Sequence, residues 1–238
     1  MHRFIVRAAT LNEDAVALEG AHARQIAVVL RMRPGDEITL VAGGSEAIAV
    51  LETVEPDHVL ARIRERGGAS TESRVALTLA LPVLRGDRSE EVVEAVTQLG
   101  VARILPFVSS RSVVRALGDA KRERWERIAR ESAETARRGQ APAVGTLRTW
   151  DELFGVLPAP ILVAWEGERE QQLRAAIPRE AAELSLVIGP EGGLADEEIA
   201  LARANDATLV SLGPRNLRAE TAAIAAVAIA MDALDQPG

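Results

Sequence analysis

The sequence predicts an α/β protein in two parts: a small β-barrel domain over residues 1–70 and a larger domain with a parallel sheet over residues 71–238. Two observations support this prediction. Short β-like runs with tight turns fill the first part, whereas strand-like and helix-like runs alternate in the second. Two strands of the second part each end in a glycine-rich turn, which marks the expected ligand site.

The first domain is expected to be a small barrel because its strands are short and separated by turn signals such as Pro34-Gly35-Asp36 and Gly43-Gly44. One short helix over residues 22–31 interrupts them, and residues 67–71 (GGAST) read as a linker. The strand candidates are residues 4–6, 38–41, 47–51 and 59–63.

The second domain is expected to alternate strands and helices in the manner of βαβ units. The expected strands are residues 75–81, 101–105 (closed by Pro106), 161–164, 184–188 and 208–212. The expected helices are residues 89–99, 119–138, 169–177, 195–205 and 219–234. Trp125 marks the packing face of the second helix, and the alanine-rich last helix is expected to pack in the core, with a dimer seam as the alternative.

Composition excludes several classes of protein. The apolar share of 47% and the charged share of 26% are those of a globular protein, and no apolar run reaches the roughly 18 residues of a membrane span. There are no cysteines, and the three histidines have no ligand-like spacing, so no metal site is expected. The charged start of the chain lacks the apolar stretch of a signal peptide, so we expect a cytoplasmic protein.

The net charge of −7 is unevenly distributed along the chain. Residues 71–150 carry 14 basic and 10 acidic groups, whereas residues 151–238 carry 6 basic and 15 acidic groups. A phosphate backbone responds to the local patch more than to the total charge, because salt screens exposed charges beyond about 8 Å. The basic middle therefore leaves nucleic-acid binding open, with a solvated helix face as the alternative.

The two glycine turns do not match the common phosphate-binding motifs. Residues 189–193 (GPEGG) are not G-x-G-x-x-G, and no G-K-[ST] occurs anywhere in the chain. Glu191 would also place a carboxylate beside phosphates. S-adenosylmethionine fits better, because it has no phosphate and carries a sulfonium cation. The alternative is that both turns use glycine only for its backbone freedom.

Two longer motifs contain these turns: residues 188–194 (IGPEGGL), followed by Glu197 and Glu198, and residues 212–222 (LGPRNLRAETA). Together they resemble the signature of the ribosomal RNA small subunit methyltransferase E family, in the SPOUT class of knotted methyltransferases. The resemblance extends over most of the chain. Further segments that carry it are residues 2–6, 29–31, 34–36, 86–88, 99–101, 111–114 and 124–125.

The resemblance implies a PUA-like N-terminal barrel that binds RNA, a C-terminal SPOUT domain with an α/β trefoil knot, and a homodimer. It also implies S-adenosylmethionine as cofactor and methylation of a uridine at N3 in the 16S rRNA of the small ribosomal subunit. Neither a membrane nor a metal is implied. Spacing alone does not indicate the knot, since chains rarely thread through loops.

Residue roles follow from the matched motifs. Arg218 is the expected catalytic residue, because an arginine stabilises negative charge on the uracil; the alternative is that it only pairs with Glu220. The cofactor is expected to contact Ala164, Trp165, Glu166, Gly189, Glu191, Gly192, Leu212, Gly213, Asn216 and Leu217. RNA phosphates are expected to contact Arg3, Arg7, Arg31, Arg85, Arg88, Arg111 and Arg138.

The chain departs from the family pattern at three places. The family usually has a serine-like cap where this chain has Ala195, so we expect Asp196 to cap the helix instead. Gln98 replaces a frequent glutamate. A Gln-Ser pair is replaced near Arg137 and Arg138, and of these two arginines we favour Arg138 as the RNA contact.

Two other functions stay open at this stage. The first is a related SPOUT methyltransferase that acts on tRNA or another rRNA site. The second is an RNA-binding module that has lost catalysis, although such a module has little reason to keep both glycine turns.

Overall fold

The computed structural model describes residues 1–43, 45–68, 72–178 and 180–235. The chain divides into two compact units, which are treated separately below. Unit 1 consists of Met1–Glu72 together with Ala133–Ala141, and unit 2 consists of Ser73–Ser132 together with Pro142–Gly238. Residues 69–71 of the expected linker lie outside the described part.

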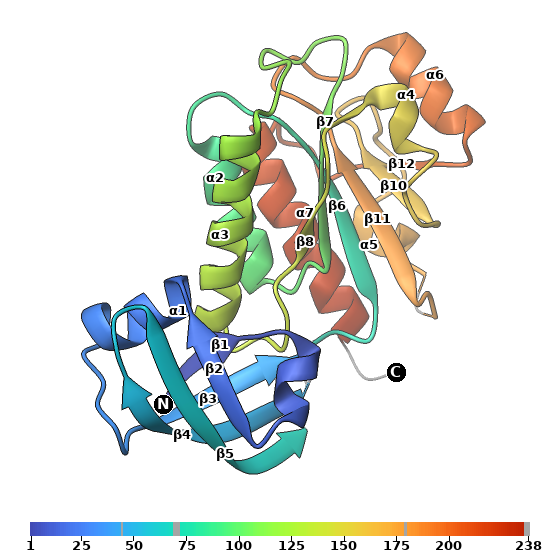
Figure 1. Cartoon of the computed structure of the whole chain (residues 1–238). Helices are drawn as coiled ribbons and strands as arrows, with labels where there is room; N and C mark the ends of the chain where they lie inside the picture. Colours follow the sequence, from blue (N-terminus) through green and yellow to red (C-terminus); the bar gives the residue numbers. More distant parts are fainter. Residues whose placement is uncertain (44, 69–71, 179, 236–238) are drawn as a thin grey trace. The chain divides into compact units, whose positions relative to one another are not determined.

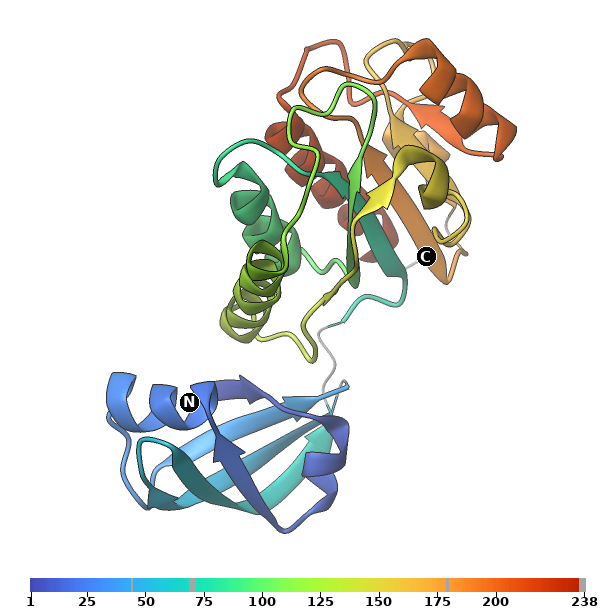
Figure 2. The ribbon, with the colours of Figure 1, turned by 45° about the horizontal axis from the view of Figure 1, so that its top comes forward.

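Unit 1 contains a curled five-stranded sheet in the order β1-β3-β4-β5-β2 (Figure 1). Its strands are β1 (His2–Ile5), β2 (Ala15–Glu19), β3 (Glu37–Ala42), β4 (Ser45–Val54) and β5 (His58–Gly68). β1 pairs parallel with β3, and the other pairs are antiparallel. Where a small barrel was expected, the sheet is curled into a half-barrel, with β1 and β2 at the two ends of its ladder. Figure 2 shows its curl.

Four strands of unit 1 were predicted and β2 was not. The sequence of β2, AVALE, has a weak apolar alternation, although Val16 and Leu18 are buried in the core of the unit. The predicted linker was partly wrong, because Gly67 and Gly68 extend β5 and pair with β4.

The helical segments of unit 1 are short. They are the 3-10 turn η1 (Ala8–Asn12), the α-helix α1 (Ala21–Arg24) and the π-helical turn η2 (Gln25–Val29). The predicted single helix over residues 22–31 is therefore split and ends early. Arg31 has φ 52°, a left-handed conformation that cannot continue the helix.

Unit 2 is built on a seven-stranded parallel sheet in the order β12-β10-β11-β6-β7-β8, with β9 also paired to β7. The strands are β6 (Ala76–Pro82), β7 (Arg103–Val108), β8 (Ala143–Val144), β9 (Arg148–Thr149), β10 (Ile161–Ala164), β11 (Glu183–Ile188) and β12 (Thr208–Val210). The prediction of a parallel sheet is confirmed.

Helices cover both faces of this sheet, because alternate residues of each strand enter different cores. Leu186 packs in one core with α2, α3, α5 and α7, and its neighbour Val187 packs in the other with α4 and α6 (Figure 1). Trp125 of α3 is fully buried, as expected. The helices are α2 (Arg88–Gln98), α3 (Asp119–Thr135), α4 (Trp150–Leu153), α5 (Leu173–Ala176), α6 (Asp196–Ala204) and α7 (Ala219–Asp235).

Several predicted boundaries in this part of the chain were wrong; β12, for example, ends at Val210 rather than at residue 212. α3 ends at Thr135 rather than Arg138, because Arg137 adopts φ 58° and Arg138 N donates to Ala133 O. α5 begins only at Leu173. β7 continues past Pro106 instead of ending there. On one side it pairs with β8 before this proline and with β9 after it. The N–H group that Pro106 lacks therefore falls between the two pairings, where no strand needs it.

Candidate active site

The site lies in unit 2, at the carboxyl ends of three neighbouring parallel strands. Ala164 of β10 is in register with Ile188 of β11 on one side and with Val210 of β12 on the other. The three strands therefore end at the same level of the sheet. The segments that follow them are brought to one edge, where open α/β sheets hold their ligands.

The first glycine turn, residues 189–193, packs closely against other parts of unit 2. A Cβ atom on Gly192 would lie 2.8 Å from Arg111 O, and one on Gly193 would lie 2.6 Å from Glu166 Oε1. Gly193 also has φ 71° and donates its N–H to Pro190 O at 2.9 Å, which closes the turn. A side chain is therefore excluded at Gly192 by contact with backbone and is disfavoured at Gly193 by its left-handed conformation.

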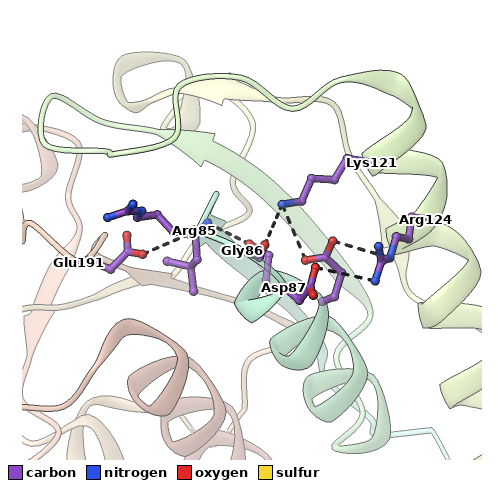
Figure 3. A network of polar contacts seen from close by, with 9 residues as sticks. Arg85, Gly86, Asp87, Lys121, Arg124 and Glu191 are labelled. Atoms are coloured by element: carbon purple, nitrogen blue, oxygen red, sulfur yellow. Dashed lines mark hydrogen bonds and ion pairs between the residues drawn. The ribbon is translucent and has the colours of Figure 1, made fainter.

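Glu191 of this turn points to the loop between β6 and α2. Its Oε1 accepts a hydrogen bond from Arg85 N at 3.3 Å and lies 3.8 Å from Arg88 Nη1. On the other side of that loop, Lys121 Nζ donates to Gly86 O at 3.2 Å, and Arg124 lies 3.9 Å from Asp87 Oδ1 (Figure 3). The loop is thus held between α3 and the first glycine turn.

The helix after the first turn has an unusual cap. Ala195 is the N-cap of α6, so the expectation that Asp196 caps it was wrong. Ala195 offers no side-chain acceptor, but Glu198 Oε2 accepts from Ala195 N at 2.8 Å. Glu198 Oε1 accepts from Ser110 N at 2.7 Å. One buried carboxylate therefore stabilises the start of α6 and fastens the loop after β7 to it.

The segment after β10 is fixed by its own hydrogen bonds. Glu168 Oε1 accepts from Glu170 N at 2.8 Å and from Gln171 N at 3.0 Å, which closes a local turn before α5. Hydrogen bonds from the backbone amides of Gln171 and Glu170 hold the pKa of Glu168 below its ordinary value. Ser211 N then donates to Gln171 O at 2.8 Å and joins this segment to the second turn.

The second glycine turn has fewer fixed contacts. Gly213 has φ 106°, and a Cβ atom there would meet open space. Arg218 is exposed and directly precedes α7, whose first turn includes the bond from Ala222 N to Arg218 O at 2.8 Å. Within the part of the chain that the structure describes, Arg218 forms no ion pair; Glu220 instead lies 3.9 Å from Arg88 Nε.

A cavity of about 750 Å³ joins the three segments. All ten residues predicted to contact a cofactor line it, as does Arg218. Sequence reasoning did not select Arg169 and Arg215, which also line the cavity and add positive charge. Arg215 lies inside the motif at residues 212–222, so its charge was the available signal, and Arg169 lies three residues after Glu166.

The arginines predicted to contact RNA differ in how exposed they are and in whether a carboxylate already pairs with them. In unit 1, Arg7 and Arg31 are exposed, whereas Arg3 forms an ion pair with Glu46 at 2.8 Å. Arg138 is only 3% exposed, and its guanidinium makes two bonds to Glu72, at 2.6 and 3.2 Å. This placement does not support the preference for Arg138 over its exposed neighbour Arg137.

In unit 2, Arg85 and Arg111 are exposed. Arg111 also donates from Nη1 to Leu194 O at 3.3 Å, beside the first glycine turn. Arg88 is different, because its guanidinium lies between two carboxylates of the cavity region.

Among residues 1–43, 45–68, 72–178 and 180–235, no group of three or more His, Cys, Asp or Glu side chains is placed to hold a metal ion. The same residues include no helix that is both long and apolar enough to cross a membrane.

Comparison with known proteins identifies the class first. Residues 71–231, which include every residue of the cavity, match the RNA methyltransferase domain family. This fold and site therefore define an RNA methyltransferase domain. The chain is also 32% identical to ribosomal RNA small subunit methyltransferase E of Bacillus subtilis, over 89% of this chain and 87% of the relative. The chain belongs to the ribosomal RNA small subunit methyltransferase E family.

Further relatives agree with this assignment. The enzyme of the same name from Mycobacterium tuberculosis is 33% identical over 88% of this chain and 82% of the relative. A crystal structure of ribosomal RNA small subunit methyltransferase E from Neisseria gonorrhoeae, bound to S-adenosyl methionine, superposes with a TM-score of 0.89. That chain is 29% identical, and the match covers 98% of both chains.

Proposed function

We propose that this protein is an S-adenosylmethionine-dependent methyltransferase that methylates N3 of a specific uridine in 16S rRNA of the small ribosomal subunit. The observation that carries the proposal is the cavity at the ends of β10, β11 and β12, lined by both glycine turns in a chain of this family. The relative from Neisseria gonorrhoeae binds S-adenosyl methionine on the same fold.

The residues around the cavity suit this cofactor. Gly189, Gly192 and Gly213 present backbone rather than side chains, as close approach to an adenosine group requires. The wall also carries both carboxylates, such as Glu166, and guanidinium groups, such as Arg169. A ligand with a sulfonium, an ammonium and a carboxylate needs partners of both signs. Ala164, Trp165, Glu191, Leu212, Asn216 and Leu217 complete the proposed cofactor contacts.

Arg218 is the proposed catalytic residue. S-adenosylmethionine supplies an activated methyl group when bound, so the protein mainly has to align it with the uridine N3. As N3 gives up its proton, negative charge develops on the uracil oxygens, and an exposed guanidinium at the cavity wall can stabilise it. Because N3 is buried in a base pair, the uridine must be unpaired or flipped out.

Four exposed arginines are the proposed phosphate contacts: Arg7 and Arg31 in unit 1, and Arg85 and Arg111 in unit 2. Arg3, Arg88 and Arg138 are not included, because carboxylates already neutralise them. Phosphate contacts position the RNA without reading its sequence, so affinity should fall steeply as salt rises.

Three features of the family complete the proposal. Residues 1–70 form a PUA-like RNA-binding domain, and residues 71–238 form a SPOUT domain with a trefoil knot. Two chains form a homodimer in the cytoplasm, where the ribosomal substrate lies. The parallel order β12-β10-β11-β6 around the cavity supports the SPOUT assignment, because it places the second glycine turn beside the segment after β10.

Methyl transfer to ribosomes tests the function. Small ribosomal subunits from a bacterial strain that lacks its own enzyme of this family are incubated with the protein and labelled cofactor, and the RNA is digested to nucleosides. We expect one labelled 3-methyluridine per 16S rRNA. A label in another nucleoside, or in tRNA added as competitor, would instead identify a related methyltransferase, and absence of transfer would leave only an RNA-binding module.

A further inference from the structure

Arg88 occupies a position that RNA binding does not explain. It is the first residue of α2, and it lines the cavity. Its Nη1 lies 3.8 Å from Glu191 Oε1 in the first glycine turn, and its Nε lies 3.9 Å from Glu220 Oε1 in the first turn of α7. One guanidinium thus connects the first turn with the helix that follows the second turn.

The loop before Arg88 fixes this position. Ser89 Oγ accepts from Leu84 N at 2.9 Å, which closes the start of α2. Arg85 N donates to the same Glu191 oxygen that Arg88 approaches, and Lys121 holds the carbonyl of Gly86 (Figure 3). The backbone that carries Arg88 is therefore tied to α3 on one side and to the first turn on the other.

The Glu220 carboxylate is partly buried and requires a nearby positive charge, which Arg88 supplies. Its side chain is only 16% exposed, and its Oε2 is buried without a hydrogen-bond partner among the described residues. A carboxylate with a buried, unpartnered oxygen is costly unless a cation is close. Glu220 lies two residues after Arg218, so the position of its carboxylate bears directly on where α7 begins and where Arg218 stands.

We propose that Arg88 is a positioning residue that holds the second turn, and with it Arg218, in register with the first turn through Glu191 and Glu220. The inference rests on the proposed function, since register matters only if both turns serve one reaction. Without the guanidinium, two carboxylates that now share it would repel each other. A planar guanidinium presents donors to both, which the single ammonium of a lysine cannot do as well.

The test separates positioning from RNA contact. Single-turnover methyl transfer to small ribosomal subunits is measured for the wild type, Arg88→Ala and Arg88→Lys, together with RNA affinity at several salt concentrations. We expect Arg88→Ala to lower the rate about 10- to 100-fold, the effect of a small misplacement of reacting groups, and Arg88→Lys to fall in between. RNA affinity and its salt slope should stay at the wild-type values.

A second arm tests the partner. Glu220→Gln removes one of the two carboxylates, so the double variant Arg88→Ala/Glu220→Gln should be more active than Arg88→Ala alone. Arg174→Ala is the matched control, since Arg174 forms an exposed ion pair with Asp232 in the same unit, and its activity should not change. Thermal unfolding of each variant identifies any that fails to fold, and Arg88→Lys then carries the test.

Three results would overturn the proposal. The first is an Arg88→Ala rate equal to that of the wild type. The second is a salt slope of RNA affinity reduced by about one in Arg88→Ala, which marks a phosphate contact. The third is a double variant no more active than Arg88→Ala alone. Failure of the proposed function would look different, because the wild type itself would then transfer no methyl group.

Discussion

The two glycine turns share an edge of the same sheet but differ in how they are held. The first turn is fixed from outside: Glu191 is held by Arg85 and Arg88, Gly192 packs against Arg111 O, and Leu194 O accepts from Arg111. In the second turn, residues 214–216 and 218 are exposed, and Gly213 N donates only at 3.2 Å to the nearby Ser211 Oγ.

This difference suggests that the two turns have different roles. The first turn forms a wall of the cavity that contacts from Arg85, Arg88 and Arg111 hold in place, although Glu191 and Gly192 are themselves exposed. The second turn presents side chains, Arg215, Asn216 and Arg218 among them, that are available to a ligand or a substrate. Substitutions that crowd the first turn should therefore weaken cofactor binding, and loss of the polar side chains of the second turn should slow the chemistry.

The largest effect is expected from Arg218→Ala. Loss of one donor to a developing negative charge typically costs about 10²- to 10³-fold in rate. Calorimetry should find S-adenosylmethionine affinity within a few-fold of the wild type, because the first turn is intact. Arg218→Lys keeps the charge without the planar fork and should recover part of the rate. Wild-type turnover of Arg218→Ala would show that the second turn does not carry the chemistry.

A single alanine substitution in each turn, at Gly192 and at Gly213, compares how the two turns tolerate an added methyl group. In Gly192→Ala the new Cβ would lie 2.8 Å from a backbone oxygen of Arg111, so the turn must shift; we expect a loss of about 1–3 kcal/mol in cofactor binding. In Gly213→Ala the Cβ meets open space, and the cost is the strained φ, about 1–2 kcal/mol of folding stability. Calorimetry and urea unfolding of both variants check this, and equal cofactor affinities would contradict it.

A smaller effect is expected at Glu198, which supports the first turn from behind. Glu198→Ala leaves the amides of Ser110 and Ala195 without their acceptor, which should reduce the free energy of unfolding by about 1–3 kcal/mol. Glu197→Ala is the matched control, since Glu197 is exposed in the same first turn of α6. Urea denaturation should separate the two variants clearly, and similar midpoints would show that Glu198 is not a support.

The smallest effect is expected at Glu168, in the segment that joins the second turn. Its pKa is lowered by the amides of Gln171 and Glu170, so its contribution to stability is present above the unfolded pKa and is lost as pH falls through the folded pKa. The difference in stability between the wild type and Glu168→Gln should therefore be small at neutral pH and vanish at strongly acidic pH. A difference that grows as the solution is acidified would have the wrong sign.

Local pattern predicted much of unit 2. The strand over residues 161–164 was predicted with its observed bounds, and the turns at residues 189–193 and 213–218 lie together as the parallel register requires. The prediction that residues 164–166 contact the cofactor came from the resemblance to the family. Its residues line the same cavity as both turns.

The sequence could not show which charged residues are already paired. Arg138 bonds Glu72 across 66 residues, Ser110 bonds Glu198 across 88, and Arg85 bonds Glu191 across 106. Such partners are chosen by the fold and leave no local signal. The same holds for Arg88, which resembles a phosphate contact in the sequence and lies between two carboxylates in the structure.

The predicted helix boundaries were wrong where side-chain hydrogen bonds or backbone conformation ended a helix that the apolar spacing would continue. Glu168 binds the two amides before α5 and keeps them out of the helix, and Arg137 ends α3 in a left-handed conformation. These are local effects, but they depend on a rotamer or a φ angle that apolar spacing does not report.

A crystal structure of the protein with S-adenosylmethionine would show where the cofactor binds. We expect cofactor density in the cavity between residues 189–193 and residues 212–218, with the methyl group on the side of Arg218. Density at another place in unit 2, or in unit 1, would contradict it.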